Sequence, residues 1–123
     1  AQMNDNIATM EDFQPLSECE IETVNKAVEE YKSFNTVPCT ACRYCTDGCP
    51  VSIRIPDVIS ALNQAKVYGL GAKARGMYEK AVDGAGNPAD CISCGQCSAV
   101  CPQHLDIPSI MKEASEKFAK KEN

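Results

Sequence analysis

Apolar residues recur at helical spacing in several segments of the chain, most clearly in residues 15–34. The apolar stripe of this segment consists of Ile21, Val24, Val28 and Tyr31. Ser17 and Glu20 have the spacing of a capping box, in which each side chain satisfies the backbone N–H of the other residue. The pattern therefore predicts an amphipathic helix that begins near Ser17.

The same periodicity predicts three further helices. Residues 55–69 begin with a proline and an aspartate in the first turn and end at a glycine. Residues 72–82 follow as a second helix, which Gly76 is expected to interrupt. Residues 107–121 form the last, with an apolar stripe of Ile107, Ile110, Ala114 and Phe118. Strand signals are limited to the short segments "IRIP" and "LDIP", so the expected fold class is all-α.

The first residues of the chain have a different character. Met3, Ile7, Met10 and Phe13 recur at helical spacing within residues 1–16. We expect this segment to be a loosely ordered tail or linker whose apolar stripe docks on a partner. Residues 17–123 then form the folded domain.

Composition narrows the class of protein. The chain has 123 residues, 44% of them apolar and 24% charged, which suits one small globular domain. A formal net charge of −5 argues against a nucleic-acid partner, because such proteins carry a basic surface. No apolar run has the length of a membrane span, and the N-terminal residues lack an export signal. We therefore expect a cytoplasmic protein without a membrane partner.

Nine cysteines are unusual in a chain of this kind. Their odd number and the cytosolic character of the sequence argue against a disulfide framework. Eight of them form two runs, "CTACRYCTDGCP" from Cys39 and "CISCGQCSAVCP" from Cys91. Both runs read C-x2-C-x2-C-x3-C-P, and the likeness continues beyond them at a constant offset of 52, for example from Ile55 to Ile107 and from Pro56 to Pro108. The chain therefore contains two copies of one unit, related by an expected pseudo-two-fold axis.

This spacing is typical of proteins with two [4Fe–4S] clusters, in which the fourth cysteine of each run binds the cluster of the other run. The first predicted ligand set is Cys39, Cys42, Cys45 and Cys101. The second is Cys91, Cys94, Cys97 and Cys49. The proline after each fourth cysteine fixes φ and directs the chain away from the cluster.

Two zinc ions are the alternative occupants. Structural zinc sites use paired C-x2-C knuckles that are usually far apart, which explains the double run poorly. Cys19 falls off the apolar stripe of its helix and is expected to be a free thiol. His104, the single histidine, is expected to have a surface or supporting structural role. The ring of Tyr44, inside the first run, is expected to shield a cluster.

The two runs and the long helical insert between them resemble the α-helical dicluster ferredoxins. These include the iron–sulfur domains of glutamate synthase small subunits and the C-terminal half of succinate dehydrogenase iron–sulfur subunits. A closer likeness covers almost the whole chain, through "DNIATMEDFQPLSE", "VPCTACRYCTDGCP" and "CISCGQCSAVCPQHLDIP". These segments resemble the C-terminal ferredoxin domain of a subgroup of bacterial and archaeal aldo-keto reductases, where the domain follows a (β/α)8 barrel.

That resemblance implies a parent oxidoreductase that uses a nicotinamide cofactor. The barrel's catalytic residues have no counterpart here, so no catalytic residue is assigned in this chain. Two functions are expected as alternatives: an electron-transfer module that serves a redox partner protein or an N-terminal barrel, and a docking module in which the clusters only stabilise the fold. The resemblance also implies that the chain is an excised domain or a fragment.

Overall fold

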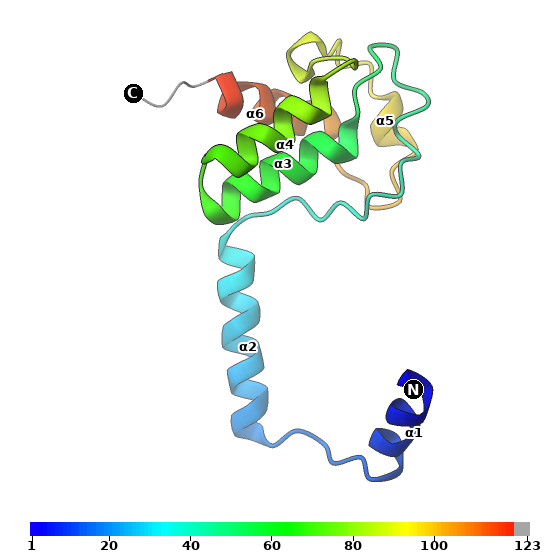
Figure 1. Ribbon diagram of the computed structural model, residues 1–123, viewed down its shortest axis with the longest axis vertical. Helices are drawn as coiled ribbons and strands as arrows, with labels where there is room; N and C mark the ends of the chain where they lie inside the picture. The colour runs from blue at the N-terminus through cyan, green and yellow to red at the C-terminus, as the bar shows by residue number, and fades with distance from the viewer. Residues whose placement is uncertain (120–123) are drawn as a thin grey trace. The chain divides into compact units, whose positions relative to one another are not determined.

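The computed structural model describes residues 1–119 and divides the chain into two compact units. The first unit spans residues 1–33 and contains α1 (Gln2–Glu11) and α2 (Glu18–Ser33). The second begins at Phe34 and contains α3 (Ile55–Tyr68), α4 (Ala72–Val82), the 3-10 helix η1 (Pro88–Asp90), α5 (Gln96–Ala99) and α6 (Ile107–Ala119) (Figure 1). Residues 1–119 contain no strand, which confirms the predicted all-α fold class. No helix in this described part is long and apolar enough to cross a membrane.

The N-terminus of α2 is closed by the predicted capping box. The backbone N–H and the hydroxyl of Ser17 donate to Glu20 Oε2 at 2.8 and 2.7 Å, and the Glu20 N–H donates to Ser17 Oγ at 3.4 Å. These hydrogen bonds lower the pKa of Glu20. Reciprocal bonds of this kind satisfy backbone donors that the first turn of a helix leaves free, so they fix where α2 begins.

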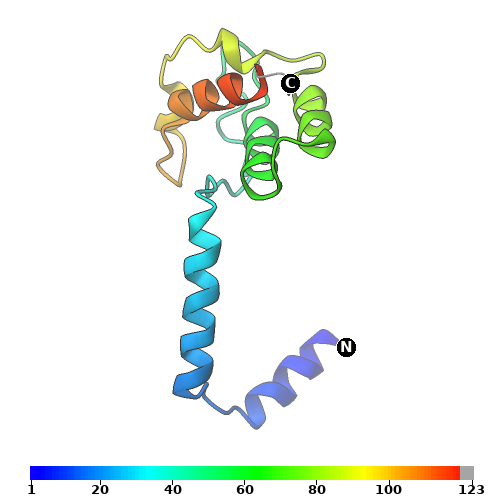
Figure 2. The ribbon, with the colours of Figure 1, turned by 90° about the vertical axis from the view of Figure 1, so that its left-hand side faces the viewer.

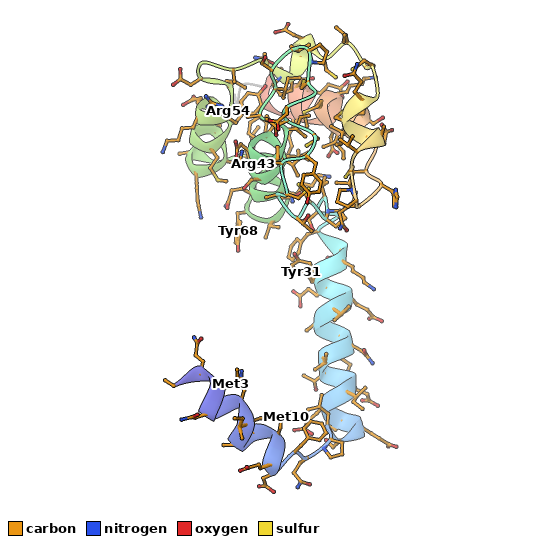
Figure 3. The ribbon with its side chains drawn as sticks, turned by 90° about the vertical axis from the view of Figure 1, so that its right-hand side faces the viewer. Met3, Met10, Tyr31, Arg43, Arg54 and Tyr68 are labelled. Atoms are coloured by element: carbon orange, nitrogen blue, oxygen red, sulfur yellow. The ribbon has the colours of Figure 1, made fainter. Side chains whose placement is uncertain are left out.

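Neither helix of the first unit has a buried residue. The predicted stripes are present but uncovered: Met3 is 70% exposed, Met10 68% and Tyr31 65% (Figure 3). Phe13 lies beyond the end of α1 and is also exposed. An amphipathic helix gains most of its stability by covering its apolar face. The exposed stripes of α1 and α2 are therefore suited to packing against another protein surface.

The second unit is built around α3, which packs against α4 and α6 (Figures 1 and 2). Its apolar face is fully buried at Val58, Ile59 and Leu62. The buried face of α6 is Ile107, Met111, Ala114 and Phe118. The sequence prediction placed Ile110 in this stripe, where the structure has Met111. Starting from Ile107, residues that follow at steps of four, three and four stay closer to one face of a helix than residues whose first step is three.

Gly76 does not interrupt α4, which runs unbroken from Ala72 to Val82. A glycine in a helix interior costs about 1 kcal/mol relative to alanine. Packing offsets that loss, because Ala74 and Ala81 are buried and the ring of Tyr78 stacks on Phe118 with centroids 4.2 Å apart. The expected interruption was wrong because tertiary contacts outweigh the local preference.

The segment that leads into the first cysteine run is tied to α3. The N–H of Val37 donates to Asn63 Oδ1, and Asn63 Nδ2 donates to the carbonyl of Val37, both at 2.8 Å. One turn further along α3, Lys66 Nζ donates to the carbonyl of Asn35 at 2.9 Å and pairs with Glu113 of α6 at 2.9 Å. These bonds set the position at which the chain enters the run.

The loop before η1 lies close to the backbone that follows the first run. The N–H of Gly86 donates to the carbonyl of Ser52 at 3.0 Å, and a Cβ at Gly86 would lie 1.9 Å from the carbonyl oxygen of Val51. We predict that Gly86→Ala destabilises the protein by about 1–3 kcal/mol, the range found for overpacked sites. Thermal unfolding of the anaerobically purified protein measures this.

Gly76→Ala is the matched control, since a Cβ there meets nothing within 4 Å. It should leave stability unchanged or raise it by up to about 1 kcal/mol. Equal melting temperatures for the Gly86→Ala variant and the unsubstituted protein would show that the close approach is not required.

Candidate metal centre

The eight cysteines of the two runs line two cavities in the second unit. Cys39, Cys42, Cys45 and Cys101 line the first cavity. Cys91, Cys94, Cys97 and Cys49 line the second cavity. Each cavity thus receives three thiols from one run and the fourth from the other, and these are the two sets that the spacing predicts. Within residues 1–119, no three His, Cys, Asp or Glu side chains are grouped closely enough to hold a single metal ion.

Two isoleucines stand between the cavities. Ile55 and Ile107 line both cavities, and each is 1% exposed. They are the first residues of α3 and α6 and occupy equivalent positions in the repeat. The walls behind them are also apolar, with Pro56 and Ile59 in the first cavity and Pro108 and Met111 in the second. The arrangement gives two sulfur-lined sites that share these two buried, apolar side chains as a partition.

The repeat extends to the backbone conformation around the cysteines. Among residues 1–119, six residues other than glycine have positive φ, and five of them belong to the cysteine-containing segments. They pair at the repeat offset: Ala41 with Ser93 (φ 54° and 54°), Arg43 with Gly95 (67° and 76°), and Ser52 with His104 (59° and 52°). The two runs are therefore equivalent in conformation, including places where their residues differ.

Hydrogen bonds at the two Cys–Pro corners repeat as well. The N–H of Cys49 donates to Thr46 and that of Cys101 donates to Ser98, both to the carbonyl oxygen at 3.2 Å. The N–H of Ser52 donates to the carbonyl of Cys49 at 2.9 Å, and that of His104 donates to Cys101 at 3.0 Å. The matching geometry delivers the fourth cysteine of each run to the opposite cavity.

Positive φ next to ordinary conformations turns successive backbone N–H groups toward one side, which makes a concavity suited to anions and to iron–sulfur sites. One such contact is formed in the first cavity, where the N–H of Ala41 donates to Cys39 Sγ at 3.4 Å. A non-glycine residue held in this region costs about 1–3 kcal/mol. Its repetition at equivalent positions suits sites that must surround a negatively charged group of thiolates and sulfides.

A hydroxyl residue follows the third cysteine of each run. Ser98 Oγ accepts from the N–H of Ile107 at 3.0 Å, and the Ser98 side chain also hydrogen-bonds Cys97. Its counterpart Thr46 has a buried Oγ1 without a hydrogen-bond partner among residues 1–119. A buried hydroxyl normally has a partner. Thr46 lines neither cavity, so the fit to an iron–sulfur group rests on the donor set: each cavity is lined by four thiols and by no carboxylate or imidazole of the described residues.

Burial raises the pKa of the Cys45 and Cys97 thiols, and the neighbouring thiols raise it further. In Cys97 the hydrogen bonds from the backbone and from Ser98 act in the opposite direction. Iron binds the thiolate, so loading these sites must displace protons from thiols that burial keeps protonated.

An ion pair lies beside the first cavity. Arg43, which lines that cavity, places Nη2 2.9 Å from Asp57 Oδ1 and Nη1 3.3 Å from Asp57 Oδ2. The hydrogen bond and the charge of Asp57 raise the pKa of Arg43. Asp57 belongs to the first turn of α3, so the pair ties the first cysteine loop to that helix.

The remaining residues singled out in the sequence line neither cavity. Tyr44 is 67% exposed and lines neither cavity, so the expected shielding role was wrong. His104 is exposed, and its backbone has a positive φ of 52°. Cys19 is exposed on α2 and lines neither cavity.

Sequence reasoning did not identify the partition residues Ile55 and Ile107 as part of the site, nor the hydroxyls of Thr46 and Ser98. Both pairs carry a signal, because both recur at the offset of 52. The comparison of the two copies already pairs Ile55 with Ile107, and extending it to every position between the cysteines would also have paired Thr46 with Ser98. The ion pair of Arg43 and Asp57 has no such signal, since neither residue recurs in the second copy.

Comparison with known proteins agrees with this geometry. The chain is similar to the fumarate reductase iron-sulfur subunit of Haemophilus influenzae, with 28% identity over 97 residues that cover 76% of this chain and 37% of that protein. The chain thus spans little more than a third of that relative's length. No solved structure matches it. The family described as 4Fe-4S dicluster domain matches residues 38–106, which is more than half of the chain and includes all eight cysteines of the two runs. The protein therefore belongs to the 4Fe-4S dicluster domain family.

Proposed function

We propose that the chain is an electron-transfer module that holds two [4Fe–4S] clusters, one in each cavity. The observation that carries the proposal is that four thiols line each cavity in the crossed arrangement typical of two-cluster proteins. Such clusters supply one-electron redox chemistry. The chain's own residues would bind them through the thiolates, keep water from their inner faces and orient backbone N–H groups toward the sulfurs.

The crossed ligation also keeps the two clusters close. Cys45 and Cys49 are four residues apart, so their Cα atoms are separated by at most about 14 Å even in an extended chain. The same limit applies to Cys97 and Cys101. With only the partition of Ile55 and Ile107 between the cavities, an electron on one cluster has a short path to the other.

A finer proposal concerns the protein that contains the module. We infer from the motif likeness described above that the domain follows the barrel of an aldo-keto-reductase-like oxidoreductase. The exposed stripes of α1 and α2 support this, because they offer apolar side chains and have no buried residue. In this proposal the first unit packs on the barrel, and the clusters exchange electrons with the barrel or with an external redox protein.

Elemental analysis tests the proposed occupants. Anaerobically purified protein should be brown and contain about eight irons and eight sulfides per chain, as two [4Fe–4S] clusters require. A colourless protein that contains two zinc ions per chain would contradict the proposal. Dithionite should also reduce the clusters, giving paramagnetic signals. Clusters that stay oxidised at very low potential would favour a structural or docking role instead.

Serine substitutions test the crossed ligation. Cys49→Ser combined with Cys94→Ser should damage the second cluster and spare the first, because both residues line the second cavity. Cys49→Ser combined with Cys42→Ser should damage both clusters. Electron paramagnetic resonance and iron content of the two double variants report which clusters remain.

Cys19→Ser is the matched control and should retain both clusters, since Cys19 lines neither cavity. The opposite pattern, in which the Cys49/Cys94 pair removes both clusters and the Cys49/Cys42 pair leaves one, would mean that each run binds its own cluster.

The proposed parent is tested at the gene. The coding sequence upstream of the codon for Ala1 should encode an eight-stranded (β/α) barrel in the same reading frame. An in-frame stop codon a short distance upstream, or an upstream domain of another fold, would rule out the aldo-keto reductase parent while leaving the cluster assignment intact.

A further inference from the structure

The two cysteine loops have equivalent backbone conformations but differ in charge. Arg43 corresponds to Gly95 in the repeat, and Asp57 corresponds to Ser109. Arg43 and Gly95 both have positive φ, 67° and 76°, so the backbone places the two positions alike and only the side chain differs. The first loop therefore presents a cation where the second loop presents none.

The ion pair has a defined orientation relative to the first cavity. Arg43 is one of the residues that line this cavity, together with three thiols of its own run. Asp57 holds the guanidinium with two hydrogen bonds and is not among the lining residues (Figure 3 labels Arg43). Of the two charged residues, Arg43 is therefore the one that borders the cavity with the thiols. Apart from the thiols, no described residue that lines the second cavity is ionisable.

We propose that the Arg43–Asp57 pair selectively raises the reduction potential of the cluster in the first cavity and so makes the two clusters unequal. This inference rests on the proposed function, in which each cavity holds one [4Fe–4S] cluster. An electron that arrives in a cavity adds one negative charge, and a cation beside it stabilises that charge. Net charge near a cluster is one of the factors that set its potential.

Two effects work against the pair without changing the sign of its contribution. The Asp57 carboxylate cancels part of the field of Arg43, and solvent screens the rest because the Arg43 side chain is 57% exposed. In the second cavity, the hydrogen bond between Ser98 and Cys97 stabilises negative charge on sulfur. The decisive test is therefore the direction in which each half of the pair shifts the potential.

Removing the two halves should shift the potential of the first cluster in opposite directions. Arg43→Gln leaves the negative charge of Asp57 beside the cavity and should lower the potential. Asp57→Asn leaves the cation uncancelled and should raise it. Arg43→Lys keeps the charge and should stay close to the unsubstituted protein. The double variant Arg43→Gln/Asp57→Asn lacks the whole pair and should lie between the two single variants and below the unsubstituted protein; a potential at or above that of the unsubstituted protein would contradict the proposal.

The measurement is an anaerobic redox titration followed by electron paramagnetic resonance, at fixed pH and low salt. Each variant is made in the full chain and again in a Cys94→Ser background, in which the first cluster should be the one that remains. Lys73→Gln is the charge control, because Lys73 is exposed near the start of α4. The cavities adjoin the other end of the α3–α4 pair, about 20 Å away at 1.5 Å per residue along α3. Lys73→Gln should shift the reduction potential of neither cluster.

A transplant makes the converse test. Gly95→Arg together with Ser109→Asp recreates the pair in the second copy and should raise the potential of the second cluster. A Cβ at Gly95 meets no atom within 4 Å, and Arg43 already adopts a similar φ, so the backbone can accept the substitution.

The outcomes separate this inference from the proposed function. Arg43→Gln and Asp57→Asn variants that shift the potential in the same direction would show that the pair only holds the loop in place, and the inference is wrong. Shifts no larger than that of Lys73→Gln overturn it too. Iron and sulfide are measured in every sample. If the unsubstituted protein contains no iron or sulfide, the proposed function is wrong. If the clusters are present but their potentials do not shift as expected, only the inference about the ion pair is wrong. Where Arg43→Gln loses its cluster, Asp57→Asn and the transplant decide.

Discussion

The exchange of the fourth cysteine between the two runs is the constraint on which the rest of the second unit depends. Cys101 lines the cavity of the first run, and Cys49 lines the cavity of the second, so neither site has four thiols until both copies have folded together. Local sequence alone can bring three thiols to a site, but the fourth arrives only when α3 and α6 have packed. Cluster binding and tertiary folding are therefore coupled, as in other small metal-binding domains whose ligands converge only in the folded state.

The partition shows how this coupling is built. Ile55 and Ile107 each serve three purposes: they begin a helix, they contribute to the buried core, and they separate the two cavities. A polar residue at either place would remove apolar contact from both cavities at once. The two halves of the repeat are thus joined by buried core residues as well as by the exchanged cysteines.

The sequence allowed the elements to be predicted because they follow from short-range spacing. The two sets of four cysteines that line the cavities were instead predicted from the repeated run and from the crossed ligation typical of two-cluster proteins. The capping box of Ser17 and Glu20 and the start of α3 at Ile55 depend on neighbouring residues, and the structure agrees with both. The errors concern long-range packing. Gly76 stays helical because its neighbours pack on α3 and α6. Met111 is fully buried, whereas Ile110 is only partly buried against the core, and Tyr44 is exposed and lines neither cavity. The positive φ of Ala41 and Ser93 was also beyond prediction, because these residues rarely adopt that conformation without a site that requires it.

The electrostatics of the site combine a symmetric part with an asymmetric one. Both α3 and α6 begin at the partition, so the partial positive charge of each N-terminus lies beside the cavities and favours negative charge in both. The repeated backbone conformation around the thiols adds a second contribution common to the two sites. Because these contributions are shared, they stabilise the clusters without distinguishing them. Differences between the sites come from hydrogen bonds such as that of Ser98 with Cys97, and from side chains that the repeat does not copy. Arg43, paired with Asp57, is a charged residue of the second kind and lines the first cavity. A duplicated fold can in this way keep two binding sites of equivalent backbone conformation while their side chains differ in charge, which is the basis proposed above for unequal reduction potentials.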